Sequence, residues 1–117
     1  MQNFQAGDYL IFQVESGYGL LRLLEIDEAK GEKVWHLAAF NEMFLDVESA
    51  DAALANPSAL TVNIPHAALT NRAFEATQTA RMLSLPLTAA ELNELEATKK
   101  DAKEASDLSI RLLLGLR

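Results

Sequence analysis

Three apolar segments, separated by short turns, occupy the first 40 positions of the chain. They span residues 8–15, 20–27 and 33–40. Residues 16–19 and 28–32 lie between them and contain glycine, which is typical of hairpin turns. We expect residues 16–19 to form the first turn, since Gly17 and Gly19 are able to adopt positive φ angles. The pattern therefore predicts a three-stranded antiparallel meander.

Both faces of this predicted sheet are apolar. Strand alternation places Leu10 and Phe12 on one face and Tyr9 and Ile11 on the other. Such a sheet either curls into a barrel that is also covered outside, or uses one face for binding. Burial is the commoner outcome for aromatic side chains. The aromatic, acid-rich hairpins remain the region where a protein partner would bind.

The middle of the chain is less regular. Residues 49–55 are expected to form a short helix with Ser49 as its N-cap. Residues 60–64 alternate between apolar and polar, which predicts a fourth strand, and Pro65 is expected to end it. Residues 71–78 are expected to form another short strand or an extended edge.

A long helix is predicted over residues 88–114. Thr88 and Glu91 have the spacing of a capping box. An apolar stripe follows at helical spacing, formed by Leu92, Leu95, Ala102, Ala105, Leu108 and Leu112. Gly115 is suited to the position just after the helix.

This helix would be too long for a small sheet to cover. It would measure about 40 Å, whereas a domain of this size has a radius of gyration near 13 Å. Its apolar end is then buried by a kink near residues 99–101, by a dimer mate, or by a partner. We expect a homodimer, because two-fold pairing is the commonest assembly. The predicted organisation is a barrel-like domain at 1–87 and a helix at 88–117 that packs on it or on a dimer mate.

The chain has a net charge of −7, and the acidic excess lies in its first half. Residues 1–51 hold ten acidic and three basic side chains. Nucleic acid is disfavoured as a partner, because phosphate binding needs basic side chains. A basic protein would be steered toward this half, although acidity more often serves solubility alone.

The composition also bears on location. The chain has no cysteine, which excludes disulfides and thiolate sites. No apolar run approaches the roughly 20 residues that span a bilayer. Residues 1–5 lack the basic and apolar regions of a signal peptide. We expect a cytoplasmic protein without membrane contact.

Catalytic and metal-binding patterns are not found. His36 is expected inside the sheet and His66 at the surface, so their spacing predicts no shared metal site. Asp27 and Glu28 are expected in an exposed turn, which offers no pocket for acid–base catalysis. The chain has no Gly-x-Ser-x-Gly elbow, and its Gly-Tyr-Gly sequence lacks the rest of a phosphate loop. We expect no enzymatic activity, no metal and no cofactor.

The start of the chain has a recognisable order of motifs. Phe4 precedes a strand that opens with Gly7 and Asp8, and a Gly-Tyr-Gly hairpin at 17–19 leads into a second strand. These first 40 residues resemble the small SH3-like β-barrels of the bacterial immunity protein 26 type. The resemblance implies a non-catalytic protein that binds and blocks a toxin of the same bacterium. An acidic surface would suit a basic toxin.

The sequence thus predicts the α+β class, with an SH3-like, strongly bent antiparallel sheet or barrel and a long C-terminal helix. The favoured function is a protein–protein interaction module of the immunity type. The alternative is a small-ligand-binding protein or accessory subunit that uses the aromatic interior of the sheet. The residues expected to bind a partner are Tyr18, Glu25, Asp27, Glu28, Trp35 and His36.

Overall fold

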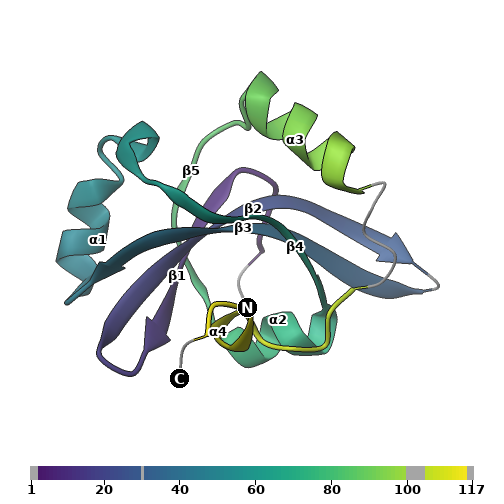
Figure 1. The fold of residues 1–117 in the computed structure, drawn as a ribbon, viewed down its shortest axis with the longest axis horizontal. Coiled ribbons are helices and arrows are strands. Elements are labelled where there is room, and N and C mark those ends of the chain that lie inside the picture. The colour runs from purple at the N-terminus through teal and green to yellow at the C-terminus, as the bar shows by residue number, and fades with distance from the viewer. Residues whose placement is uncertain (1–2, 30, 100–104, 116–117) are drawn as a thin grey trace.

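A five-stranded antiparallel sheet forms the centre of the protein (Figure 1). The computed structural model describes residues 3–29, 31–99 and 105–115. The strands are β1 (Asp8–Val14), β2 (Gly17–Ala29), β3 (Glu32–Phe44), β4 (Val62–Thr70) and β5 (Ala80–Ser84), in the spatial order β4-β3-β2-β1-β5. The α+β class and the antiparallel meander are therefore confirmed. The second and third strands are longer than predicted, and β5 was not predicted at all.

The sheet is open, so of the two predicted forms, a bent sheet or a barrel, the barrel is not formed. Strands β4 and β5 lie at its two edges and do not pair with each other in the described part of the chain. Helices cover the faces instead. They are α1 (Val47–Ala53), α2 (Asn71–Thr77), α3 (Ala89–Lys99) and α4 (Ile110–Leu113), with a 3₁₀ turn, η1 (Pro57–Ala59). None of the described helices has the length and apolar composition needed to cross a bilayer.

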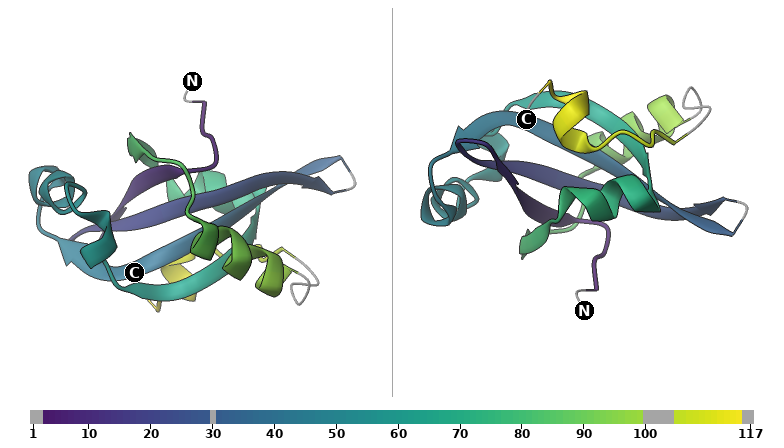
Figure 2. Two further views of the ribbon diagram at one scale, coloured as in Figure 1. Left: turned by 90° about the horizontal axis from the view of Figure 1, so that it is seen from above. Right: turned by 90° about the horizontal axis from the view of Figure 1, so that it is seen from below.

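Both faces of the sheet are buried, as their apolar alternation indicates. On one face, Leu10 and Phe12 pack with Phe74 of α2 and Ile110 of α4. On the other face the cover comes from α1 and α3. There Tyr9, Ile11, Phe40 and Leu54 form one cluster, and Leu24, Ala38 and Leu95 form another. The β2–β3 hairpin extends beyond this covered body at one end (Figure 2).

The first hairpin turns two residues earlier than expected. Val14 pairs with Gly17, and neither Gly17 nor Gly19 has a positive φ angle. A close approach explains both glycines. A Cβ atom on Gly17 would lie 2.2 Å from the carbonyl oxygen of Phe44, and one on Gly19 would lie 2.7 Å from the Phe12 ring.

Two boundaries in the middle of the chain differ from prediction. Asp46 caps α1 in place of Ser49, because its carboxylate accepts a hydrogen bond from the Ser49 amide at 2.7 Å. Pro65 lies inside β4 and does not end it. Proline is tolerated there because β4 is an edge strand and its pairing with β3 shifts register beside Pro65.

Residues 71–77 form a helix, so the predicted strand or extended edge is wrong. The Thr70 hydroxyl accepts a hydrogen bond from the Ala73 amide at 3.2 Å and caps the helix. Gln78 has a φ angle of 57° and ends it. The side chains of Ala73 and Phe74 bury one face, which stabilises a helix too short to be stable by itself.

The single long C-terminal helix is also wrong. The capping box is present, with Thr88 and Glu91 bonding each other's backbone amides, but α3 ends at Lys99. The chain then lies along β4, where Ser106 exchanges backbone hydrogen bonds with Ala68 and Thr70. Ile110 is fully buried.

This return of the chain onto the sheet matters for the predicted dimer. Part of the predicted kink, residues 100 and 101, lies outside the described residues. Helical i,i+4 ion pairs contribute only about 0.2–0.5 kcal/mol each, whereas burying an isoleucine contributes about 1.5–3 kcal/mol. The burial of Ile110 therefore outweighs continuation of the helix. Leu108 and Leu112 remain more than half exposed, so the homodimer stays a prediction.

A buried arginine fixes α3 to the sheet. Arg22 of β2 is 2 % exposed and forms two hydrogen bonds with the Glu91 carboxylate, at 3.0 and 3.1 Å. It also donates to the carbonyl oxygens of Gly7 and Pro86 and stacks over Tyr9. Burial would raise the pKa of Glu91, but these bonds and those from Thr88 outweigh it and hold that pKa below its usual value.

Candidate functional site

The β2–β3 hairpin carries most of the residues predicted to bind a partner. These are Glu25, Asp27 and Glu28 on β2, and Trp35 and His36 on β3. Tyr18 is the exception, because it lies near the start of β2 opposite Phe44. Asp27 is nine positions further along β2, which is about 30 Å at 3.3 Å per residue. Tyr18 therefore does not belong to the same site.

A β-bulge decides which of these side chains meet. Leu23 pairs with Leu37 and Glu25 pairs with His36, so β2 has one extra residue, Leu24, between the two pairs. A bulge re-aims the side chains that follow it. Here it brings Glu25 onto the His36 face, together with Asp27 two residues on. Trp35 points to the opposite face.

On the Trp35 face, three aromatic rings pack together beside α2. Trp35 stacks on Phe74 at 3.8 Å between ring centroids and an interplanar angle of 6°. Phe4 contacts both rings edge-on, at 6.0 and 5.5 Å. The indole N–H of Trp35 donates to the Asn71 side chain at 2.8 Å. The rings and the amide are thus held in one arrangement.

A cleft of about 1050 Å³ opens over this aromatic group, between the hairpin and α2. Its charged lining residues are Glu28, Glu32, Lys33, Arg72, Glu75 and Asp107. Arg72 is paired with Asp107, and the hydrogen bonds from Arg72 and Thr70 lower the pKa of that carboxyl. Lys33 lies 5.8 Å from the Trp35 ring. Three glutamates against one lysine leave the rim acidic.

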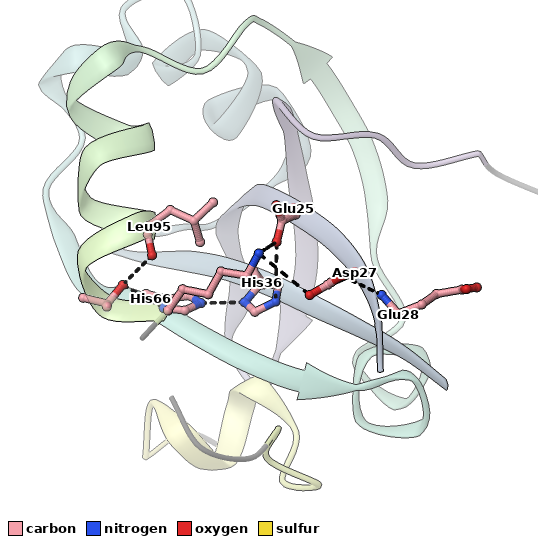
Figure 3. A network of polar contacts seen from close by, with 8 residues as sticks. Glu25, Asp27, Glu28, His36, His66 and Leu95 are labelled. Carbon is pink, nitrogen blue, oxygen red and sulfur yellow. Dashed lines mark hydrogen bonds and ion pairs between the residues drawn. The ribbon is translucent and has the colours of Figure 1, made fainter. Parts of the chain in front are cut away.

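On the His36 face, the two histidines of the chain meet (Figure 3). Nδ1 of His36 lies 2.7 Å from Nε2 of His66, which comes from β4. Nδ1 of His66 lies 2.8 Å from the Thr98 hydroxyl on α3. Burial lowers the pKa of both imidazoles, with the Glu25 charge opposing it. The expectation that His66 lies apart at the surface is therefore wrong.

Two carboxylates and an ammonium group complete this cluster. Oε2 of Glu25 lies 3.9 Å from Nε2 of His36. The ammonium of Lys99, at the end of α3, bonds Glu25 and lies 3.8 Å from Asp27. The Glu25 hydrogen bond raises the pKa of Lys99. The Glu28 carboxylate points away from the cluster (Figure 3).

Sequence reasoning missed Phe4, Phe74, His66, Thr98 and Lys99. The aromatic residues could be predicted as core but not as neighbours of Trp35. His66 and Lys99 reach the hairpin from β4 and α3, and no spacing in the sequence indicates this. Only the pairing of β3 with β4, which sets His36 opposite Ala68, brings His66 to the cluster.

Comparison with protein-family models, with curated proteins and with solved structures finds no match to this chain. The resemblance to the immunity protein 26 type therefore stays a prediction from the first 40 residues.

Proposed function

We propose that the protein is a non-catalytic binding module that holds a basic segment of a partner protein in the cleft between the β2–β3 hairpin and α2. The observation that carries this proposal is the combination of an aromatic floor with an acidic rim. Trp35 and Phe74 form the floor, and Glu28, Glu32 and Glu75 contribute the rim charge.

The two features have different roles in recognition. Tryptophan is one of the residues that most often dominate binding energy at protein interfaces. Acidic rim residues accelerate association with a basic partner and favour it over acidic competitors. Glu28 and Glu32 are exposed at the projecting end of the hairpin, where a partner meets them first.

The finer proposal is that the partner is a basic toxin and that the protein neutralises it. Support comes from the sequence resemblance at residues 4–40, which also implies an SH3-like ancestry for the sheet, and from the acidic first half of the chain. An immunity protein needs no catalytic group. A binding surface on a rigid strand pair is sufficient for it.

The proposal is tested by capture from an extract of the native cell with three immobilised proteins. They are the wild type, E28K/E32K, and the control E48K/D51K on α1, at the other end of the sheet (Figure 1). We expect the same basic protein on the wild type and the control, and its loss on E28K/E32K. With that partner purified, the association rate for E28K/E32K should fall at low salt and lose most of its salt dependence. Identical captures on all three proteins would refute the role of the cleft.

A small ligand is the second candidate, and the size of the cleft favours it. Ligand pockets commonly measure about 300–1,000 Å³, which is close to this cleft. Trp35 is the only tryptophan, so its fluorescence reports any molecule that binds there. A neutral ligand would change that emission equally in wild type and E28K/E32K and at any salt concentration. A basic protein partner would not.

A further inference from the structure

The hydrogen-bond chain on the His36 face determines where the imidazole protons lie. The Thr98 hydroxyl donates its single hydrogen to the Glu94 carbonyl at 2.7 Å, so it accepts from Nδ1 of His66. Neutral His66 then has a bare Nε2, which accepts from Nδ1–H of His36. Neutral His36 is left with a bare Nε2.

This nitrogen is buried, and no described residue forms a hydrogen bond with it. His36 is 4 % exposed, and its Nε2 has no hydrogen-bond partner among the described residues. Oε2 of Glu25 is another acceptor and lies 3.9 Å away, beyond hydrogen-bond range. A buried polar atom without a partner is costly. The lone pair of His36 Nε2 lies near the carboxylates of Glu25 and Asp27. A cation could bind to all three groups at once.

We propose that Nε2 of His36 and the carboxylates of Glu25 and Asp27 bind a divalent transition-metal ion of the Zn²⁺ type. One imidazole and two carboxylates suit Zn²⁺ better than Mg²⁺, which seldom takes a nitrogen ligand. The site lies on the hairpin face opposite the cleft and does not depend on the proposed partner binding.

The geometry is close to that of a bound ion. The three ligand atoms lie within 4.8 Å of one another. In a tetrahedral zinc site, ligands about 2.0 Å from the metal are roughly 3.3 Å apart, so small side-chain movements suffice. His66 supplies the outer hydrogen bond that a metal-binding histidine usually has on its other nitrogen. A water completes the coordination.

Lys99 now holds the cation position. Its ammonium bonds Glu25 and lies near Asp27, but it leaves Nε2 of His36 without a partner. The Lys99 side chain is 33 % exposed at the last residue of α3, so it can turn outward. It is therefore a competitor that the metal displaces, and its removal should strengthen metal binding.

The test is calorimetric titration of the metal-free full chain, without a histidine tag, with Zn²⁺ and separately with Mg²⁺. We expect one Zn²⁺ site and no comparable Mg²⁺ binding. E25Q and D27N should each weaken Zn²⁺ binding more than about tenfold, the lower limit for loss of even an outer-sphere partner. The matched control E28Q removes a neighbouring carboxylate outside the cluster and should change nothing.

Two further results keep the proposal falsifiable. K99M should bind Zn²⁺ more tightly, and Co²⁺ added to the wild type should give the visible absorption of a tetrahedral site, which E25Q reduces. Circular dichroism melting confirms that each variant folds. Zn²⁺ binding that is absent, that survives both E25Q and D27N, or that weakens in K99M would overturn the proposal.

Discussion

Trp35 and His36 are neighbours on β3, but their side chains lie on opposite faces of the sheet, and the two faces differ in how their polar atoms are bonded. On the Trp35 face the polar atom of the indole is bonded to Asn71, and the rings of Phe74 and Phe4 pack against it. On the His36 face a chain of hydrogen bonds ends in a buried nitrogen that has no partner in the part of the chain that the structure describes. On the Trp35 face the indole N–H has its hydrogen-bond partner, whereas on the His36 face one ring nitrogen lacks a partner among the described residues.

The difference shows that the alternation and the bulge of one strand pair decide which side chains lie on each face. Alternation alone separates Trp35 from His36, and the bulge at Leu24 then adds the carboxylate of Glu25 to the polar face. The proposed partner cleft and the proposed cation site therefore lie on opposite faces of one hairpin. The predictions below disturb one face at a time.

The largest effect is expected from Phe74→Ala on the Trp35 face. Removing a buried phenylalanine typically costs about 3–5 kcal/mol of unfolding free energy, here through lost stacking on Trp35. Urea unfolding followed by circular dichroism measures it. Phe4→Ala is the control, since Phe4 is only half-buried and makes edge contacts worth about 0.5–1.5 kcal/mol each. Equal losses in both variants would show that the stack is not the centre of this face.

The next effect concerns α3, which brings Thr98 and Lys99 to the His36 face. Glu91→Gln removes the charge that pairs with the buried Arg22, and we expect a loss of about 1.5–3 kcal/mol, as for hydrogen bonds to charged groups. Glu94→Gln, an exposed site on the same helix, should stay within about 0.5 kcal/mol of wild type. If Glu91→Gln also changed the unfolding free energy by no more than about 0.5 kcal/mol, the ion pair with Arg22 would not be what holds α3 on the sheet.

A smaller effect is expected from pH, and it reports on the His36 face alone. Burial lowers the folded-state pKa of His36 and His66, so the unfolded chain binds protons more readily below about pH 6.5. Stability is then full above the unfolded pKa and falls as the pH drops through the folded values. Urea unfolding should show lower stability at about pH 5.5 than at about pH 7.5. His66→Gln should reduce this difference, and a wild type that is more stable at the lower pH would contradict the network.

Much of the sheet could be predicted from the sequence, because its signals are local. The alternation of Leu10 and Phe12 with Tyr9 and Ile11 indicates two buried faces, which the structure confirms. The spacing of Thr88 and Glu91 predicts the start of α3, which is also confirmed.

The rest depends on contacts that no local pattern encodes. The predicted continuation of the helix to residue 114 is not observed, because burying Ile110 and pairing Ser106 with β4 stabilise the chain more. Glu25, Asp27 and His36 were selected from the sequence as partner-binding residues, and the structure brings them together, but their role stays a prediction. Their meeting depends on an unpredicted bulge, and the second histidine arrives through the register of β3 with β4.

The central claim, that the two faces of the hairpin are separate binding sites, is tested most directly by nuclear magnetic resonance of the side-chain nitrogens. Spectra of the metal-free protein are recorded before and after one equivalent of Zn²⁺. We predict that His36 starts with a proton on Nδ1 and none on Nε2, and that Zn²⁺ shifts the Nε2 signal while the indole signal of Trp35 stays in place. A proton on Nε2 in the metal-free protein, or a Trp35 signal that moves while both His36 nitrogens do not, would contradict the account.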